Sequence, residues 1–188
     1  VHRLGRFTSG LQVCARDPMT RASLSKQFRP EGSCKKVYQA WAQRVPGLEQ
    51  GTTLTVTSDV VERQHPLLGW VWGPEPLKQE PIRKRLTALS ELELLERTAE
   101  GDRLQVTITT GRPHQIRIHL AQLGSPLLGD PLYLLNREIS ATATPGDGGY
   151  RLHAWQLSGL PHLGETTLQV DPSVEGDQAL RNSINREK

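Results

Sequence analysis

The sequence contains little cysteine, with 2 residues in a chain of 188. Cys14 and Cys34 are too few to build a disulfide framework, and their spacing fits no metal site, so a reducing compartment is expected. The sequence also has no signal peptide and no run of about 18 apolar residues that could cross a membrane. These absences predict a cytoplasmic protein that binds no metal.

Several patterns that would indicate other chemistry are also missing. His114 and His119 lie on different faces of a helix, so they cannot form the i, i+4 pair of a zinc site. The glycine-rich residues 146–149 are not followed by the lysine of a phosphate-binding loop. Ser9, His114 and Asp130 lack the surroundings of a nucleophile elbow, which argues against a serine hydrolase. These observations argue against a zinc site, a phosphate-binding loop and a serine hydrolase.

Positive charge is concentrated at the start of the chain. The whole chain carries a net charge of +3, whereas residues 1–44 contain only two acidic side chains, Asp17 and Glu31. The basic residues of this segment are Arg3, Arg6, Arg16, Arg21, Lys26, Arg29, Lys35, Lys36 and Arg44. Such an asymmetry is typical of a surface that binds nucleic-acid phosphates, but composition alone also fits a plain solvated basic surface.

One stretch, residues 104–133, combines a strand, a glycine turn, a helix and a loop rich in Gly and Pro. Apolar and polar residues alternate over residues 104–109, which predicts a half-buried strand. Gly111 suits the turn that follows, because glycine adopts backbone conformations that other residues resist. Pro113 suits the first position of a helix, where no backbone donor is needed.

The helix predicted after this turn has apolar residues on two sides. Ile116, Leu120 and Leu123 fall on one stripe, and Ile118 and Ala121 fall on another. A helix that is apolar on more than one side is largely buried, so we expect it to pack inside the core.

His114 and Arg117, one turn apart, must emerge between these two stripes. The guanidinium of Arg117 is therefore expected close to the core, where an arginine without an anionic partner costs about 3–5 kcal/mol. Spacing alone leaves two interpretations open. Arg117 pairs with a structural Asp or Glu, or it belongs to a functional site.

The central stretch closely resembles the signature of the RluA-type pseudouridine synthases. Residues 110–119 match the family pattern TGRTHQIRxH, with Pro113 in place of the usual Thr or Ser. Residues 124–133 match GxPLxGDxxY. Two further segments resemble the family: residues 2–11 follow HRLDxxTSGL except at one position, and residues 36–40 follow KxYxA.

The resemblance implies an enzyme that turns a uridine out of structured RNA and rejoins its uracil to the ribose through carbon, without a cofactor. In that family the arginine of the first motif, here Arg3, helps to displace the base, and Tyr38 would pack against the base. Arg117 would point into the active site and face the catalytic aspartate. Residues 152–154 resemble the family's LHA element, which helps to close the core near that site. The residues expected to bind RNA are Arg3, Arg6, Lys35, Lys36, Arg112 and His114.

One position departs from the first motif: Gly5 stands where the family has its catalytic aspartate. Loss of such a group commonly lowers turnover by roughly 10⁴ to 10⁶. Another carboxylate could reach the site, with Asp130 and Asp17 the nearest candidates by motif context. Alternatively, the protein binds or folds RNA without modifying it. The sequence is thus compatible with pseudouridine formation in rRNA or tRNA and with a catalytically silent RNA-binding protein.

The resemblance also implies an α+β fold, with a mixed and largely antiparallel sheet flanked by helices. Trp70 and Trp72 fall in a predicted hairpin or loop, where they either pack or stack on RNA. A helix of about ten residues is predicted from Pro18. Further strands are predicted over residues 11–15, 35–45, 52–57, 86–89, 92–95 and 166–170.

Residues 1–170 are predicted to form one catalytic domain, and residues 171–188 a polar C-terminal tail. The chain opens on Val1 inside a motif, so we expect a fragment that lacks the first strands of the domain. We expect a monomer whose partner is rRNA or tRNA.

Overall fold

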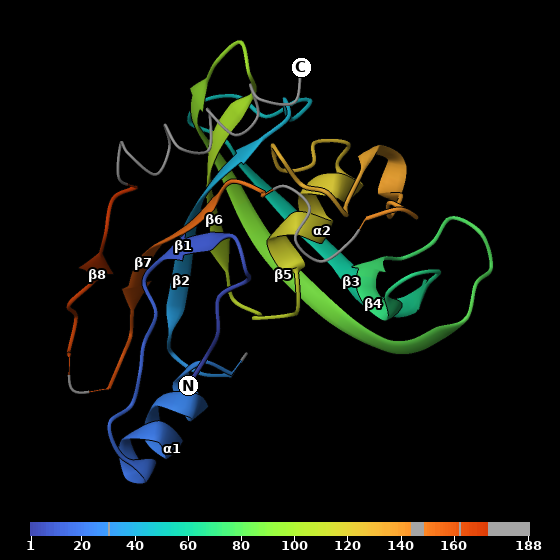
Figure 1. The fold of residues 1–188 in the computed structure, drawn as a ribbon. Helices are drawn as coiled ribbons and strands as arrows, with labels where there is room; N and C mark the ends of the chain where they lie inside the picture. The colour runs from blue at the N-terminus through green and yellow to red at the C-terminus, as the bar shows by residue number, and fades with distance from the viewer. Residues whose placement is uncertain (30, 144–148, 162, 173–188) are drawn as a thin grey trace.

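The computed structural model describes residues 1–29, 31–143, 149–161 and 163–172. In this part of the chain, eight strands form one sheet in the order β1-β7-β2-β6-β5-β3-β4, and β8 also pairs with β7 (Figure 1). β1 runs parallel to β7, whereas the other strand pairs are antiparallel. The predicted mixed, largely antiparallel sheet is therefore confirmed. The strands are β1 (Thr8–Gly10), β2 (Lys35–Ala42), β3 (Thr53–His65), β4 (Gly69–Pro74), β5 (Ile82–Arg97), β6 (Asp102–Ile108), β7 (Leu152–Ser158) and β8 (Leu168–Gln169).

Helix α1 (Pro18–Gln27) begins where the sequence predicts it. The Thr20 backbone N–H donates to Asp17 Oδ1 (2.8 Å), and the Thr20 hydroxyl donates to Asp17 Oδ2 (2.7 Å). Pro18 follows at the first helical position, where its missing N–H is not needed. A short 3₁₀ helix spans Leu135–Arg137. In the described residues, no helix is long and apolar enough to cross a membrane.

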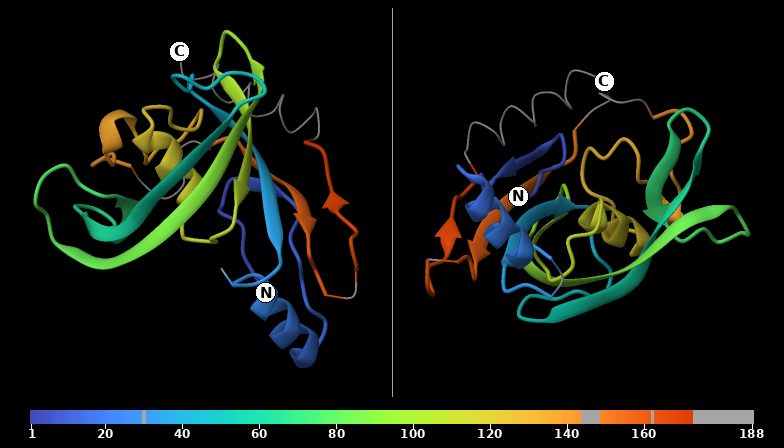
Figure 2. Two further views of the ribbon diagram at one scale, coloured as in Figure 1. Left: turned by 180° about the vertical axis from the view of Figure 1, so that it is seen from behind. Right: turned by 90° about the horizontal axis from the view of Figure 1, so that it is seen from below.

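Helix α2 (Gln115–Gln122) is buried inside the curve of the sheet, and β3 and β5 bend around it (Figure 2). Its two apolar stripes pack against different parts of the core, as the two-sided pattern predicts. Ile116 and Leu120 join the cluster that contains residues of β2 and β6. Ile118 and Ala121 join a second cluster with residues of β3 and β5. The helix therefore buries apolar side chains on two sides, each in a different core cluster.

Strand β2 is the strand that carries Tyr38. It pairs with β6 on one side and β7 on the other, so Tyr38 lies opposite Val106 and Ala154. The register with β7 shifts between Val37 and Tyr38, an irregularity of the kind that re-aims side chains. β1 pairs with β7 as well, with Thr8 opposite Leu152. These pairings bring the N-terminal segment close to Tyr38.

Residues 11–15 were predicted as a strand, and this prediction is wrong. The Val13 backbone N–H donates to His2 Nε2 (2.9 Å) instead of to a neighbouring strand. The alternating residues Leu11 and Val13 nevertheless pack against the cluster that contains Leu24. The alternation therefore predicts the burial correctly. The Leu11 N–H still donates to the Ala154 carbonyl of β7 (2.9 Å), but in the described residues the pairing does not continue along residues 12–15 as a ladder would.

Strands β3 and β5 are longer and less interrupted than the sequence predicts. β3 extends past residue 57 to His65, because its second half pairs with both β4 and β5. β5 is one strand over Ile82–Arg97, not two short ones. Trp72 packs against the second core cluster, whereas Trp70 is 37% exposed and lies against the Arg83 guanidinium. The predicted hairpin is confirmed as the β3–β4 turn.

Two sequence predictions concern parts of the chain that are not described. The glycine-rich residues 146–148 and residues 173–188 of the predicted tail lie outside the described residues.

His119 is fully buried on α2. Its Nδ1 lies 2.9 Å from the Ser90 hydroxyl, and its Nε2 has no hydrogen-bond partner in the described part of the chain. Burial lowers the pKa of His119 from 6.5 to about 4, because an imidazolium would lose its hydration there. The folded protein therefore keeps a neutral ring at a pH where the unfolded chain takes up a proton.

We expect the free energy of unfolding to fall as the pH is lowered from about 6.5 to about 4. In this window the unfolded state binds the proton and the folded state does not, so stability is lost at up to about 1.4 kcal/mol per pH unit for each such histidine. Urea unfolding at several pH values would measure this slope. His119→Gln should have a shallower slope than the wild type, and equal slopes would contradict the assignment.

Candidate active site

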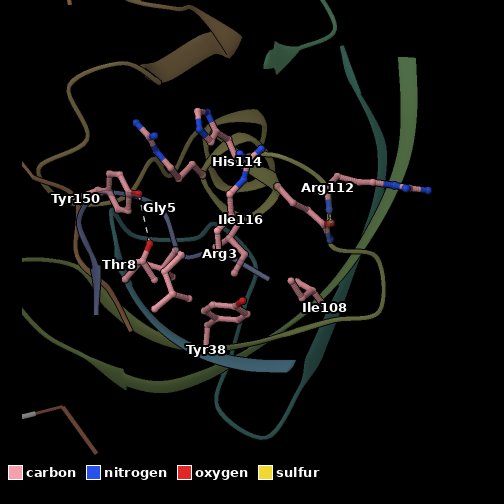
Figure 3. A pocket seen from close by; sticks show the side chains of 13 residues that line it. Arg3, Gly5, Thr8, Tyr38, Ile108, Arg112, His114, Ile116 and Tyr150 are labelled. Carbon is pink, nitrogen blue, oxygen red and sulfur yellow. Dashed lines mark hydrogen bonds between the residues drawn. The ribbon is translucent and has the colours of Figure 1, made fainter. Parts of the chain in front are cut away.

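Two neighbouring cavities form one cleft between the N-terminal segment, β2, α2 and the turn that precedes α2. The first has a volume of about 110 Å³ (Figure 3), and the second, of about 350 Å³, extends toward α1. The first is lined by Arg3, Leu4, Gly5, Thr8, Tyr38, Ile108, Arg112, His114, Gln115, Ile116, Arg117, Tyr150 and Leu152. The second shares Arg3, Tyr38, Ile108 and Arg112 with it and adds Val1, His2, Ser25, Phe28, Arg29, Lys36 and Gly111.

The cleft is strongly basic. Among the described residues, no Asp or Glu lines either cavity, whereas both linings contain arginine. Lys36 is only 4% exposed, and its Nζ lies 5.9 Å from the centre of the Phe28 ring. Burial lowers the pKa of Lys36 from its usual value. This charge, concentrated in a concave surface, favours an anionic ligand.

The Gln115 side chain holds the turn that carries Arg112. Its Oε1 accepts hydrogen bonds from the Thr110 hydroxyl (2.8 Å) and the Arg112 backbone N–H (3.0 Å). Its Nε2 donates to the Leu89 carbonyl (2.7 Å) and the Ser90 hydroxyl (2.9 Å). Because Leu89 and Ser90 belong to β5, one amide group ties the turn to the sheet.

His114 closes this turn with a left-handed backbone, φ 54°. The helix therefore begins after His114 and not at Pro113, which corrects the predicted start. His114 Nδ1 lies 2.6 Å from Tyr133 Oη, and the Tyr133 hydroxyl donates its proton to the Trp72 carbonyl (2.5 Å). Nδ1 must then be the donor, so Nε2 is the unprotonated nitrogen of the neutral ring. Burial is the main reason why the pKa of His114 is lowered to about 4.

Arg117 is fixed by a buried ion pair. Its Nε donates to Asp130 Oδ2 (2.7 Å) and its Nη2 to Asp130 Oδ1 (2.6 Å), with side-chain exposures of 9% and 1%. The guanidinium also packs against the rings of Tyr133 and Tyr150, 4.6 Å and 4.1 Å from their centres. Burial opposes the charge, but the hydrogen bonds to Asp130 outweigh it and raise the pKa of Arg117. Arg117 therefore pairs with a structural carboxylate, Asp130, which the sequence spacing alone could not identify.

Neither carboxylate suggested as a substitute for the aspartate is available in this geometry. Both oxygens of Asp130 bind Arg117, and Oδ1 also accepts from the Leu132 and Tyr133 backbone N–H groups. Both oxygens of Asp17 cap helix α1 on the exposed surface. The structure thus gives the two carboxylates other roles.

Gly5 is packed against Tyr150, a residue that the sequence reasoning missed. A methyl group built on Gly5 would overlap the Tyr150 hydroxyl oxygen, and it would lie 3.2 Å from Thr8 Oγ1. Thr8 Oγ1 and Tyr150 Oη are 3.3 Å apart (Figure 3). The space next to Gly5 is therefore occupied. The only sequence signal for Tyr150 is its position, two residues before the element at 152–154.

The structure brings most of the predicted site residues together. Gly5, Tyr38 and Arg117 line the first cavity, and so do Arg3, Arg112 and His114. Lys36 lines the second. Arg6 and Lys35 line neither: Arg6 lies against the Phe7 ring, and Lys35 is exposed at the start of β2. The chemical roles of all these residues stay predictions.

Tyr38 extends from β2 into the first cavity (Figure 3). Burial, with a smaller contribution from Cys34, raises the pKa of Tyr38 to about 12, so its phenol stays protonated at neutral pH. The described residues contain no group of three His, Cys, Asp or Glu side chains that could hold a metal ion.

The sequence that contains these motif segments also identifies the family of the chain. A family model described as RNA pseudouridylate synthase matches residues 1–122. The chain belongs to this family. The resemblance to RluA-type synthases, drawn from the motifs, is confirmed.

Two curated pseudouridine synthases illustrate the similarity. An uncharacterized RNA pseudouridine synthase of Synechocystis is 39% identical over 168 residues, which cover 87% of this chain and 53% of the relative. Ribosomal large subunit pseudouridine synthase D of Nitrosomonas europaea is 30% identical over 190 residues, which cover 98% of this chain and 50% of the relative. The chain thus spans about half the length of the curated relatives it matches.

The fold is shared with a solved structure of this pseudouridylate synthase family. Human RNA Pseudouridylate Synthase Domain Containing 1 superimposes with a TM-score of 0.61 at 24% identity, over 96% of this chain and 78% of that one. This similarity supports the α+β architecture described above.

Asp130→Asn should destabilise the protein by about 3–5 kcal/mol, because it leaves the Arg117 guanidinium buried without its counter-charge. Chemical unfolding would measure the change. Glu96→Gln is the matched control, since Glu96 pairs with Arg103 on the surface, with side chains 53% and 38% exposed, and should change stability little. Equal effects of the two substitutions would contradict a buried role for Asp130.

The contact between Gly5 and Tyr150 predicts a non-additive pair of substitutions. Gly5→Ala should cost about 1–3 kcal/mol of unfolding free energy through overpacking. In Gly5→Ala/Tyr150→Phe most of this cost should disappear, because the ring Cζ lies at an ordinary 3.5 Å from the added methyl. A double-mutant cycle by thermal unfolding measures the coupling, and additive effects would show that the two residues do not touch.

Proposed function

We propose that the chain is the catalytic part of an RNA pseudouridine synthase, which isomerises uridine to pseudouridine in rRNA or tRNA. The proposal rests mainly on one observation. Arg3, Tyr38 and Arg117 come from three separate motif segments, and they line one cavity. Family membership and the basic lining of the cleft support the same function. The free cysteines Cys14 and Cys34 fit a reducing compartment such as the cytoplasm.

In this proposal the first cavity holds the flipped uridine. The ring of Tyr38 would pack against the uracil, and Arg3 would take the place of the base in the stack. Arg117 uses Nε and Nη2 to bind Asp130, so its remaining nitrogen, Nη1, can donate to the nucleotide. The ion pair thus holds a charged donor in one orientation before RNA arrives.

The second cavity would hold the RNA backbone beside the flipped nucleotide. Arg29, Lys36 and Arg112 line it, and Arg3 connects it with the first cavity. Phosphate contacts of this kind offset the free energy needed to unstack a base, and they make binding salt-dependent. The exposed positions of Arg6 and Lys35 would add only a diffuse positive field.

A catalytically silent RNA-binding protein is the alternative function. The absence of an Asp or Glu from the linings of both cavities, among the described residues, favours it. The similarity to named pseudouridine synthases gives it no support. We therefore retain the enzyme as the proposed function and treat the silent protein as an outcome of the test.

The test maps pseudouridine at nucleotide resolution in RNA from cells that lack the intact gene and from cells that carry it. We expect one or more sites to disappear without the gene and to return with the wild type. Arg117→Ala should not restore them, because the oriented donor is lost, whereas Lys84→Ala, an exposed change on β5, should. If no site depends on the gene while RNA binding is retained, the silent alternative replaces the proposed function.

A further inference from the structure

Tyr150 is a buried tyrosine whose hydroxyl lies at the wall of the first cavity. The residue is 3% exposed and lines that cavity together with Gly5 and Arg117. Its ring packs against the Arg117 guanidinium and, edge to face, against Phe7 at 5.9 Å between ring centres. The ring is therefore held in place from two directions. Nothing in the sequence motifs assigns this residue a role.

Within the described part of the chain, the hydroxyl of Tyr150 has unused hydrogen-bonding capacity. Its contact in the described residues is Thr8 Oγ1 at 3.3 Å, which is long for a bond between two hydroxyl groups. Tyr133, the other tyrosine packed on Arg117, uses its hydroxyl fully, since it donates to the Trp72 carbonyl and accepts from His114. A buried hydroxyl that is only weakly bonded, at the edge of a cavity, is available to a ligand.

Gly5 is the residue that makes room for this hydroxyl. Any side chain at position 5 would begin where Tyr150 Oη lies, because even a methyl group there overlaps the oxygen. The backbone at Gly5 does not have a positive φ, so its conformation alone does not demand glycine. The requirement for glycine is therefore steric, and it comes from Tyr150. The polar group nearest to the Cβ position of residue 5 is then a phenol contributed from a distant part of the chain.

We propose that Tyr150 is a catalytic residue that contacts the ribose of the target nucleotide through its hydroxyl. This inference rests on the proposed function and adds a residue to that site. The hydroxyl can donate to one ribose oxygen and accept from a ribose hydroxyl, and it forms no covalent bond in this role. Its contact orients the sugar while the glycosidic bond is broken and remade. It acts from the place where a longer side chain at position 5 would project.

The experiment measures pseudouridine formation by the intact protein on a transcript that carries the site mapped in cells. Initial rates over a range of transcript concentrations separate kcat from KM. Tyr150→Phe should lower kcat by about 10²-fold and leave KM within about 3-fold, because it removes an oriented donor and keeps the ring. Ser58→Ala is the matched control: it removes a hydroxyl bonded to Gln122, outside both cavities, and should leave kcat unchanged.

Substitutions at both positions test whether the Tyr150 hydroxyl occupies the place of a side chain at position 5. Gly5→Asp alone should abolish turnover, because the new side chain collides with Tyr150. Gly5→Asp/Tyr150→Phe removes the collision and places a carboxylate beside the ring, so its kcat should exceed that of Tyr150→Phe by about tenfold or more. A merely structural role for Tyr150 predicts no such gain, and a double variant no faster than Tyr150→Phe would overturn the shared location.

The outcomes separate this inference from the proposed function. A wild type that modifies no RNA overturns both. An active wild type with Tyr150→Phe at the same kcat overturns the role of Tyr150 alone. If Tyr150→Phe does not fold, Gly5→Ala/Tyr150→Phe replaces it, because the added methyl fills the space that the hydroxyl leaves. An unchanged kcat of this double variant would then overturn the role of Tyr150 in the same way.

Discussion

A guanidinium that is removed from water must find its counter-charge inside the protein, and Arg117 finds it in Asp130, 13 residues further along the chain. The pair fastens α2 to the loop that leads to Tyr133. Tyr133 in turn fixes the orientation and the protonated nitrogen of His114. The turn that carries Arg112 is anchored separately by the Gln115 amide. One side of the cleft is therefore rigid because polar groups without water must be satisfied in a single arrangement.

The parts of the fold that were predictable depend on neighbours in the sequence. The start of α1 follows from Pro18, and the two stripes of α2 follow from helical spacing, so both could be predicted from the sequence. The prediction that α2 begins at Pro113 was wrong because His114 adopts a left-handed conformation. A contact with Tyr133, which sequence spacing does not reveal, stabilises this conformation. The strand predicted at residues 11–15 failed for a similar reason, since alternation reports burial but not the presence of a partner strand.

The site itself was predictable only as far as the motifs reach. The motifs identified Gly5, Tyr38 and Arg117, and the structure places these positions around one cavity. They could not identify Tyr150, because its contact with Gly5 crosses nearly the whole chain. In the sequence, Gly5 reads as a missing side chain. In three dimensions the same position is filled, since the Tyr150 hydroxyl occupies the volume that a side chain would need.

The parallel pairing of β1 with β7 also determines when the cleft can exist during synthesis. Thr8 and Tyr150, which meet in the first cavity, are 142 residues apart. Contacts across such a separation form late, because a long loop must close before they stabilise anything. On the ribosome, the basic N-terminal segment therefore emerges long before the strand that holds it in place. The cleft is completed only when β7 has joined the sheet, so the basic segment is exposed to solvent during synthesis before the cavity that it lines exists.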